Sequence, residues 1–282
     1  MAPKRLIFLP VMALLVVGLC AGETSALKLL KTISLPGVTG RFDHFALDIK
    51  GHRLFVAALG NNTLEAIDLS AGQRVQSIPG LGKPTGVLFL PDLNRLFVAC
   101  GDDGNVRVFD ADTLRLLKTI SGLDDADNMR FDAKAGLIYV GYGSSALAVI
   151  DAAKAENIGN IPLAGHPESF QLEKNGGRIL VNVPDAQHIA VVDRGRGAVE
   201  ATWPMADFKA NFPMALDETD QPAVRRVPQP GAACRLRHRG REKGGGYRHL
   251  GGYRRSFLLC GRPQPLRLLW RGFYRCHRPK GH

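Results

Sequence analysis

The sequence predicts an all-β fold, a β-propeller of four-stranded antiparallel blades, of which this chain holds about four to five. The main observation is a repeat of 41 or 42 residues, in which Asp68, Asp110, Asp151 and Asp193 end the segments LEAID, VRVFD, LAVID and IAVVD. Each segment follows another apolar run, namely RLFVA, RLFVA, LIYVG and ILVNV. A period of this size built from short β-type runs is typical of propeller blades.

The second repeat gives the order of the elements within a blade. We expect a first strand over 86–92, a second over 95–100, a third over 106–110 and a fourth over 116–122. The Gly- and Asp-rich turn GDDGN joins the second and third strands, because its residues tolerate positive φ or bond their own backbone. The Asp that ends each third strand precedes small or polar residues, so we predict that it caps a tight turn and has no catalytic role.

The first 26 residues have the order of a secretory signal peptide. Lys4 and Arg5 precede an apolar stretch from Leu6 to Cys20, and Thr24-Ser25-Ala26 offers small residues at a cleavage site. The alternative is a membrane anchor, but the stretch is shorter than the roughly 20 residues of a spanning helix, and Pro10 interrupts it. We therefore expect a periplasmic or extracellular protein, with no membrane span after signal cleavage.

The composition changes at about Asp220. The first 220 residues hold 21 basic and 25 acidic side chains, whereas the rest holds 14 Arg and 2 Lys against one acid, Glu242. The repeat region contains one cysteine, Cys100, so it has no internal disulfide framework. We therefore divide the chain into a signal peptide (1–26), a propeller repeat region (27–220) and a basic Arg/Gly/Pro-rich tail (221–282).

The tail is predicted to be an out-of-frame reading of further blades. With one base dropped, Pro222 to Val227 can encode RLFVGC, nearly the RLFVAC of residues 95–100, and Ala233 to Arg237 can encode LVVFD. A frameshift near Asp220 would leave only a terminal strand near Leu29 to Leu35 and four to five blades in frame. We therefore expect an open ring with a disordered or irregular tail, and the coding DNA tests the hypothesis.

These repeats resemble the YVTN-type repeats of YncE-like seven-bladed β-propellers. The runs LIYVG and RLFVA stand where that family has its YVTN-like strand, and the likeness covers about Leu27 to Asp220. The resemblance implies the propeller fold, and it supports the face on which the first strands begin as a site. It identifies no ligand, because propellers carry many unrelated activities.

Candidate binding residues lie where the first strand of each blade enters the central channel. These stretches are polar: RFDHFALD, DADNMRFD (which includes Asp127), GHPESFQLE and NFPMALDE. Convergence of His, Asp, Asn and Glu on one axis suits a small molecule or a divalent cation, although the same groups could instead satisfy loops and channel water. The candidates are Asp43, His44, Asn128, Arg130, His166, Glu168 and Asn211.

The leading hypothesis is an exported, non-catalytic scaffold that binds an unknown small molecule or protein, because no nucleophile–base signature occurs. We predict no cofactor, although a divalent cation fits the polar positions. The alternative is a lactonase-like or dehydrogenase-like propeller enzyme, in which a metal held by Glu168, Asn128 and Asn211 activates water. Nucleic-acid binding through the Arg-rich tail is less favoured, because a frameshift explains the charge. A frameshifted chain could also lack function as written.

Overall fold

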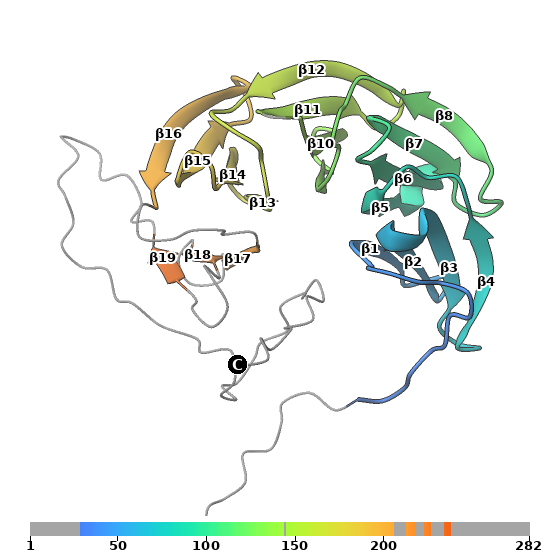
Figure 1. Cartoon of the computed structure of the whole chain (residues 1–282). Coiled ribbons are helices and arrows are strands. Elements are labelled where there is room, and N and C mark those ends of the chain that lie inside the picture. Colours follow the sequence, from blue (N-terminus) through green and yellow to red (C-terminus); the bar gives the residue numbers. More distant parts are fainter. Residues whose placement is uncertain (1–28, 144, 206–212, 218–222, 227–233, 238–282) are drawn as a thin grey trace, which may run out of the picture.

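The computed structural model describes residues 29–143, 145–205, 213–217, 223–226 and 234–237. Figure 1 shows an arc of five sheets, each running from a first strand on the inner side of the arc to its last strand farther out. Four sheets have four antiparallel strands and the fifth has three. This arrangement confirms the predicted all-β propeller architecture with four to five blades, and the blades of the described residues form an open arc.

The strands follow the predicted order. Blade 1 comprises β1 (Phe45–Asp48), β2 (Arg53–Ala58), β3 (Thr63–Asp68) and β4 (Gln73–Ile78). Blade 2 comprises β5 (Pro84–Leu90), β6 (Arg95–Cys100), β7 (Asn105–Asp110) and β8 (Leu116–Ile120). Blade 3 comprises β9 (Met129–Asp132), β10 (Leu137–Tyr142), β11 (Ala146–Asp151) and β12 (Glu156–Pro162). Blade 4 comprises β13 (Phe170–Leu172), β14 (Arg178–Val183), β15 (His188–Asp193) and β16 (Ala198–Pro204).

Blade 5 contains β17 (Met214–Asp217), β18 (Ala223–Arg226) and β19 (Cys234–Arg237). The helical segments of the described chain are two single 3-10 turns, η1 (Leu59–Asn61) and η2 (Pro91–Leu93). No helix among the described residues is long and apolar enough to cross a membrane.

The repeated aspartates cap turns, as predicted. Asp68 Oδ1 accepts hydrogen bonds from the backbone N–H groups of Ser70 (2.7 Å) and Ala71 (2.9 Å). Asp110 and Asp151 accept equivalent bonds from the turns that follow them. These N–H donors favour the ionised carboxylate and lower the pKa of both groups below the ordinary value. The aspartates therefore fix the turn between the third and fourth strands.

The hydrophobic core lies between neighbouring blades, because a blade that has a neighbour on each side is apolar on both faces of its sheet. Phe55 and Leu64 of blade 1 pack with Leu96 of blade 2 in one buried cluster. Further clusters join blades 2 and 3, blades 3 and 4, and blades 4 and 5. Met214 of β17 is buried in the last of these clusters, so the fifth sheet is packed on the fourth.

Arginines add polar links across the same boundaries. Arg53 donates to the carbonyl oxygen of Ala111 in blade 2 (2.6 Å), and Arg95 donates to that of Ala152 in blade 3 (2.8 Å). Blade 3 has Leu137 at this repeat position. At the boundary between blades 3 and 4 the arginine therefore comes from the later blade, where Arg194 lies 2.6 Å from Asp132 of β9. Each boundary among the first four blades thus contains at least one arginine link.

The structure corrects one expectation near the amino terminus. The terminal strand expected near Leu29 to Leu35 is not formed, and these residues have no regular secondary structure. In a closed ring such a strand would join the closing blade, but the described arc has no blade beyond the fifth. The predicted signal peptide (1–26) lies outside the described residues.

Two strands of the basic tail belong to the fifth sheet, which therefore extends past Asp220. β18 and β19 lie close to the segments 222–227 and 233–237, the places that the alternative frame assigns to a second and a third strand. The hairpin before β18 is one residue longer than its counterparts, because Asp217 pairs with Ala223 whereas Leu90 pairs with Arg95. The tail from residue 238 onward lies outside the described residues.

Candidate functional site

The candidate site is built largely from one position of the repeat. Asp43, Thr85, Asp127 and Glu168 follow one another at intervals of 42, 42 and 41 residues. Each lies within two residues of the start of the first strand of its blade, and first strands of successive blades contact one another along the inner side of the arc. The repeat therefore delivers acids from blades 1, 3 and 4 to the same end of the channel, and blade 2 contributes a threonine instead.

Small residues in blade 2 allow blades 1 and 3 to approach one another. The His44 N–H donates to the carbonyl oxygen of Thr85 (3.3 Å), and Thr85 Oγ1 is 2.7 Å from the carbonyl oxygen of Ala126. At the next position, a Cβ atom on Gly86 would overlap the carbonyl oxygen of Asp127. The backbone of blade 3 therefore rests directly on glycine, which brings Asp127 within reach of His44.

A histidine and two carboxylates form the centre of the site. His44 Nδ1 lies 3.0 Å from Asp43 Oδ1 and 4.0 Å from Asp127 Oδ1. The His44 side chain is 33% exposed, but its Nδ1 atom is buried. The 3.0 Å contact with Asp43 is short enough to raise the pKa of His44, but it does not meet the full geometry of a hydrogen bond, so Nδ1 has no such partner among the described residues. One donor atom from each of the three residues falls within 4.8 Å of the others.

The charges of this group shift its protonation. Burial lowers the pKa of His44, but the carboxylates of Asp43 and Asp127 outweigh that effect and leave the pKa above its ordinary value. Burial raises the pKa of Asp127, and the negative charge of Asp43 adds to the rise while His44 opposes it. Arg41 contacts the other oxygen of Asp43 at 3.2 Å from the solvent side. A cation that binds to His44 and Asp127 would therefore have to displace protons from them.

His166 and Glu168 form a neighbouring acidic corner. His166 Nδ1 contacts the carbonyl oxygen of Gly143 and lies 4.0 Å from Asp125 Oδ2. Burial raises the pKa of Glu168 to about 7, and the charges of Asp127 and Asp125 add to the rise while His166 opposes it. Glu168 is thus a carboxyl group that can gain or lose a proton near neutral pH.

Asn128 and Arg130 hold one another in place. Asn128 is buried and its Oδ1 accepts a hydrogen bond from Arg130 Nη1 at 3.3 Å. The Arg130 guanidinium lies over the ring of Phe170, 5.6 Å from its centroid, and burial lowers its pKa while Asp127 opposes the shift. These contacts link blades 3 and 4 beside the site. The cation–π contact holds the positive charge of Arg130 close to the site.

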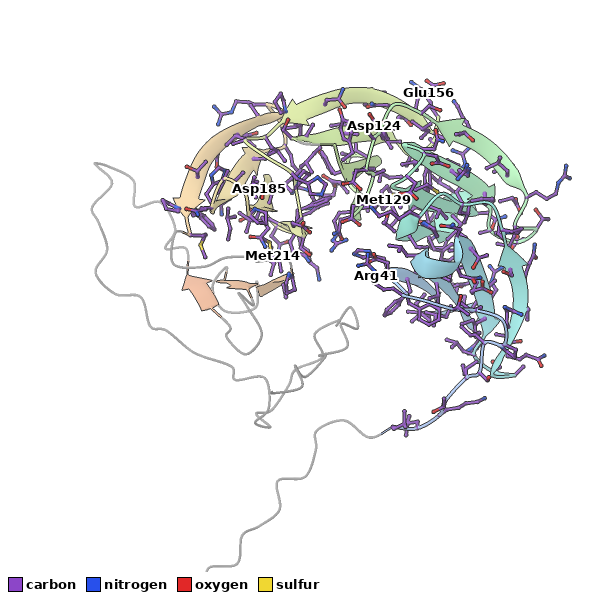
Figure 2. All side chains as sticks on the ribbon, viewed as in Figure 1. Arg41, Asp124, Met129, Glu156, Asp185 and Met214 are labelled. Carbon is purple, nitrogen blue, oxygen red and sulfur yellow. The ribbon has the colours of Figure 1, made fainter. Side chains whose placement is uncertain are left out.

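Six of the seven sequence-derived candidates lie in three pairs: Asp43 with His44, Asn128 with Arg130, and His166 with Glu168. Asp43 and His44 meet, and they are joined by Asp127, which the sequence indicates only as part of a polar stretch. Asn128 contacts Arg130. Among the described residues, the His, Asp and Glu side chains that could hold a metal together are Asp43, His44 and Asp127, and the expected set of Glu168, Asn128 and Asn211 stays a prediction. Asn211 lies outside the described residues. In Figure 2, Arg41, Met129 and Met214 mark the inner side of the arc on which the site lies.

Replacing Glu168 by Gln is expected to stabilise the protein at alkaline pH. Because the pKa of Glu168 is raised from 4.5 to about 7 on folding, the folded state binds more protons between these pH values, and stability falls as pH rises through them. Glutamine has no charge to bury, so the variant should gain about 1–2 kcal/mol at pH 8, discounted for partial exposure, and little at pH 4. Urea unfolding at both pH values measures this.

The matched control is Glu156→Gln, since the Glu156 side chain is 57% exposed and pairs with Lys118 on the outer rim (Figure 2). Its effect should be small and nearly independent of pH. Equal pH profiles for the two variants would show that Glu168 is ionised in the folded protein as easily as a surface carboxylate.

The sequence matches no protein-family model, and a search of curated proteins finds no match. Among solved structures, the chain is similar to the hydrazine synthase of Kuenenia stuttgartiensis, a protein that contains a β-propeller. The TM-score is 0.57 and the identity 16%, over 69% of this chain. The match covers 65% of the length of that structure, so the chain spans less than two thirds of it. At this identity the likeness concerns the fold alone, and that fold is a β-propeller.

Proposed function

We propose that this protein is a non-catalytic, ligand-binding propeller whose site at the inner end of the first strands binds a divalent cation. The observation that carries the proposal is the buried Nδ1 atom of His44, which faces the carboxylates of Asp43 and Asp127 without a hydrogen-bond partner among the described residues. Buried polar atoms are normally satisfied, so one that faces two acids favours a cation between them.

The chemistry of the donors suggests the class of cation. One imidazole nitrogen with two carboxylate oxygens suits first-row divalent ions such as Zn²⁺ and Mn²⁺ better than Ca²⁺, which prefers oxygen alone. The donor atoms lie within 4.8 Å of one another, which is wider than the spacing around a bound Zn²⁺, so small side-chain rotations would accompany binding. Arg41 screens the outer side of Asp43 and would compete weakly with the cation.

Isothermal titration of the full chain with Zn²⁺, Mn²⁺ and Ca²⁺ tests the proposal. We expect Zn²⁺ or Mn²⁺ to bind at one site, and we expect His44→Ala to weaken binding at least about tenfold. Because the pKa of His44 is raised, protons should compete effectively, and the affinity should fall about tenfold for each pH unit below that pKa.

His52→Ala is the matched control, because His52 lies in the turn between β1 and β2, outside the three-residue group. It should bind the same cation as the parent protein. Unchanged affinity in His44→Ala, or an equal loss in both variants, would contradict the proposed site.

The proposal places this chain in the YncE-like family with YVTN-type repeats and assigns it to the periplasm or the extracellular space. The repeat spacing and the signal-peptide order of residues 1–26 support these assignments. Secretion of the chain with removal of its leader tests the localisation. The frameshift near Asp220 is part of the same proposal, and the positions of β18 and β19 support it. An alternative reading frame broken by stop codons would rule it out.

One observation favours an enzymatic alternative. The pKa of Glu168, about 7, suits a group that takes up and releases a proton at neutral pH. A lactonase-like or dehydrogenase-like propeller would use such a group beside a metal-bound water. Turnover of a lactone that disappears in Glu168→Gln but persists in Glu156→Gln would favour the enzyme over the scaffold.

A further inference from the structure

A segment ahead of blade 1 has the sequence of an outermost strand. Residues 29–34 read LLKTIS, and residues 116–121, which include β8 and the residue after it, read LLKTIS as well. β8 is the fourth strand of blade 2 and pairs with β7. The same six residues therefore already form a fourth strand elsewhere in this chain, which shows that the sequence is compatible with that place.

The segment has no strand partner within the described structure. Residues 29–34 make no hydrogen bond to the described part of the chain, although the Lys31 side chain approaches Gly72 in blade 1. Leu29 and Leu30 are 80% and 88% exposed, whereas their counterparts Leu116 and Leu117 are 53% and 55% exposed. Pairing with a sheet edge would thus cover apolar surface that is open here.

Within the described residues, blade 5 has three strands and its outer edge is β19. In blades 1 to 4 the third strand is flanked by a fourth, namely β4, β8, β12 and β16. In blade 5 the sheet ends at β19 as far as the described residues extend. An edge strand presents a row of backbone N–H and C=O groups that can accept a further strand.

We propose that residues 29–34 of one copy add to β19 of a second copy as a fourth strand of blade 5. Pairing within one chain is disfavoured by the tether. Gly60 N–H donates to the Arg41 carbonyl oxygen (2.9 Å), and Thr39 N–H to Asn61 Oδ1 (3.4 Å), so only residues 35–38 lie between the segment and its attachment to blade 1. Four residues reach roughly 13 Å when extended, whereas β19 lies across the open side of the arc in Figure 1.

The register follows from blade 2. The first pair between β6 and β7 is Arg95 with Asp110, and the first pair between β18 and β19 is Ala223 with Arg237. When these pairs are aligned, Arg235 takes the place of Val108 and Cys234 takes the place of Arg107. In blade 2 those residues pair with Lys118 and Thr119 of β8. The added strand therefore places Lys31 opposite Arg235 and Thr32 opposite Cys234. Like charges opposite one another weaken strand pairing, so Lys31→Glu should strengthen the association.

Disulfide trapping in the full chain tests the pairing. Thr32→Cys should form a disulfide with Cys234 of another copy under mild oxidation, giving a dimer on non-reducing gels. Lys31→Cys is the matched control, because successive residues of a strand point to opposite faces, and it should cross-link several-fold less. The other cysteines are replaced by alanine: Cys20, Cys100, Cys260 and Cys276.

Mixing distinguishes the possible partners. A chain with Thr32→Cys and Cys234→Ser is mixed with a differently tagged chain that retains Cys234, and a mixed dimer supports pairing between copies. Sedimentation of the parent chain should also reveal association that Thr32→Pro reduces, since proline removes a backbone donor from a segment that forms no strand in the isolated fold. A disulfide only within single chains, equal cross-linking at positions 31 and 32, or a monomer unaffected by Lys31→Glu overturns the proposal.

Discussion

Gly86→Ala is expected to destabilise the protein by about 3 kcal/mol and to open the candidate site. The added Cβ would overlap the carbonyl oxygen of Asp127, a backbone atom that cannot rotate away as the end of a side chain could. Thr85 fixes the same loop through its bond to the Ala126 carbonyl oxygen, so relief requires blades 2 and 3 to separate. Urea unfolding measures the loss.

The control for this substitution is Gly159→Ala in β12, where a Cβ would meet nothing within 4 Å. That change should be neutral or slightly stabilising, because alanine restricts the unfolded chain more than glycine does. Since Gly86 also sets the distance between Asp127 and His44, Gly86→Ala should weaken cation binding at the proposed site and Gly159→Ala should not. Equal stabilities for the two variants would show that the close approach at Gly86 does not exist in solution.

The repeat makes most of the fold predictable. Because Asp68, Asp110, Asp151 and Asp193 recur at nearly constant spacing, the strand order within each blade follows from the amino-acid sequence alone. The terminal strand does not, because a strand needs a partner edge as well as a strand-forming sequence. Residues 29–34 have the sequence of β8 yet form no strand, since no described edge lies beside them.

The sequence predicts where the candidate site lies better than it predicts which residues form it. The entry loops of the first strands are polar in sequence, and Asp43 and His44 do lie together there. Asp127 belongs to a polar stretch that the sequence indicates, and it lies two repeat lengths after Asp43, which marks it as the equivalent position of blade 3. The role of Asn128 could not be predicted from the sequence, because it depends on a hydrogen bond from Arg130, whose guanidinium lies over Phe170 of the next blade.

The largest loss of stability is expected for Arg194→Ala, about 3–5 kcal/mol. Arg194 and Asp132 are 13% and 11% exposed and lie 2.6 Å apart across the boundary between blades 3 and 4. Arg194 also donates to the carbonyl oxygen of Glu173 at 2.7 Å. Removing the guanidinium leaves the Asp132 carboxylate in a poorly hydrated place without its counter-charge, and it leaves that carbonyl oxygen without its donor.

A second substitution separates the charge from the packing. Asp132→Asn removes the charge while its Oδ1 atom can still accept the Lys134 N–H bond of the turn (3.0 Å), so the double variant Arg194→Met, Asp132→Asn should recover part of the loss. Arg196→Ala provides the exposed comparison: its side chain is 67% exposed, and its pairs with Asp193 and Glu200 should contribute less than about 1 kcal/mol. If Arg194→Ala cost no more than Arg196→Ala, the Arg194–Asp132 pair would add no measurable stability to the boundary between the two blades.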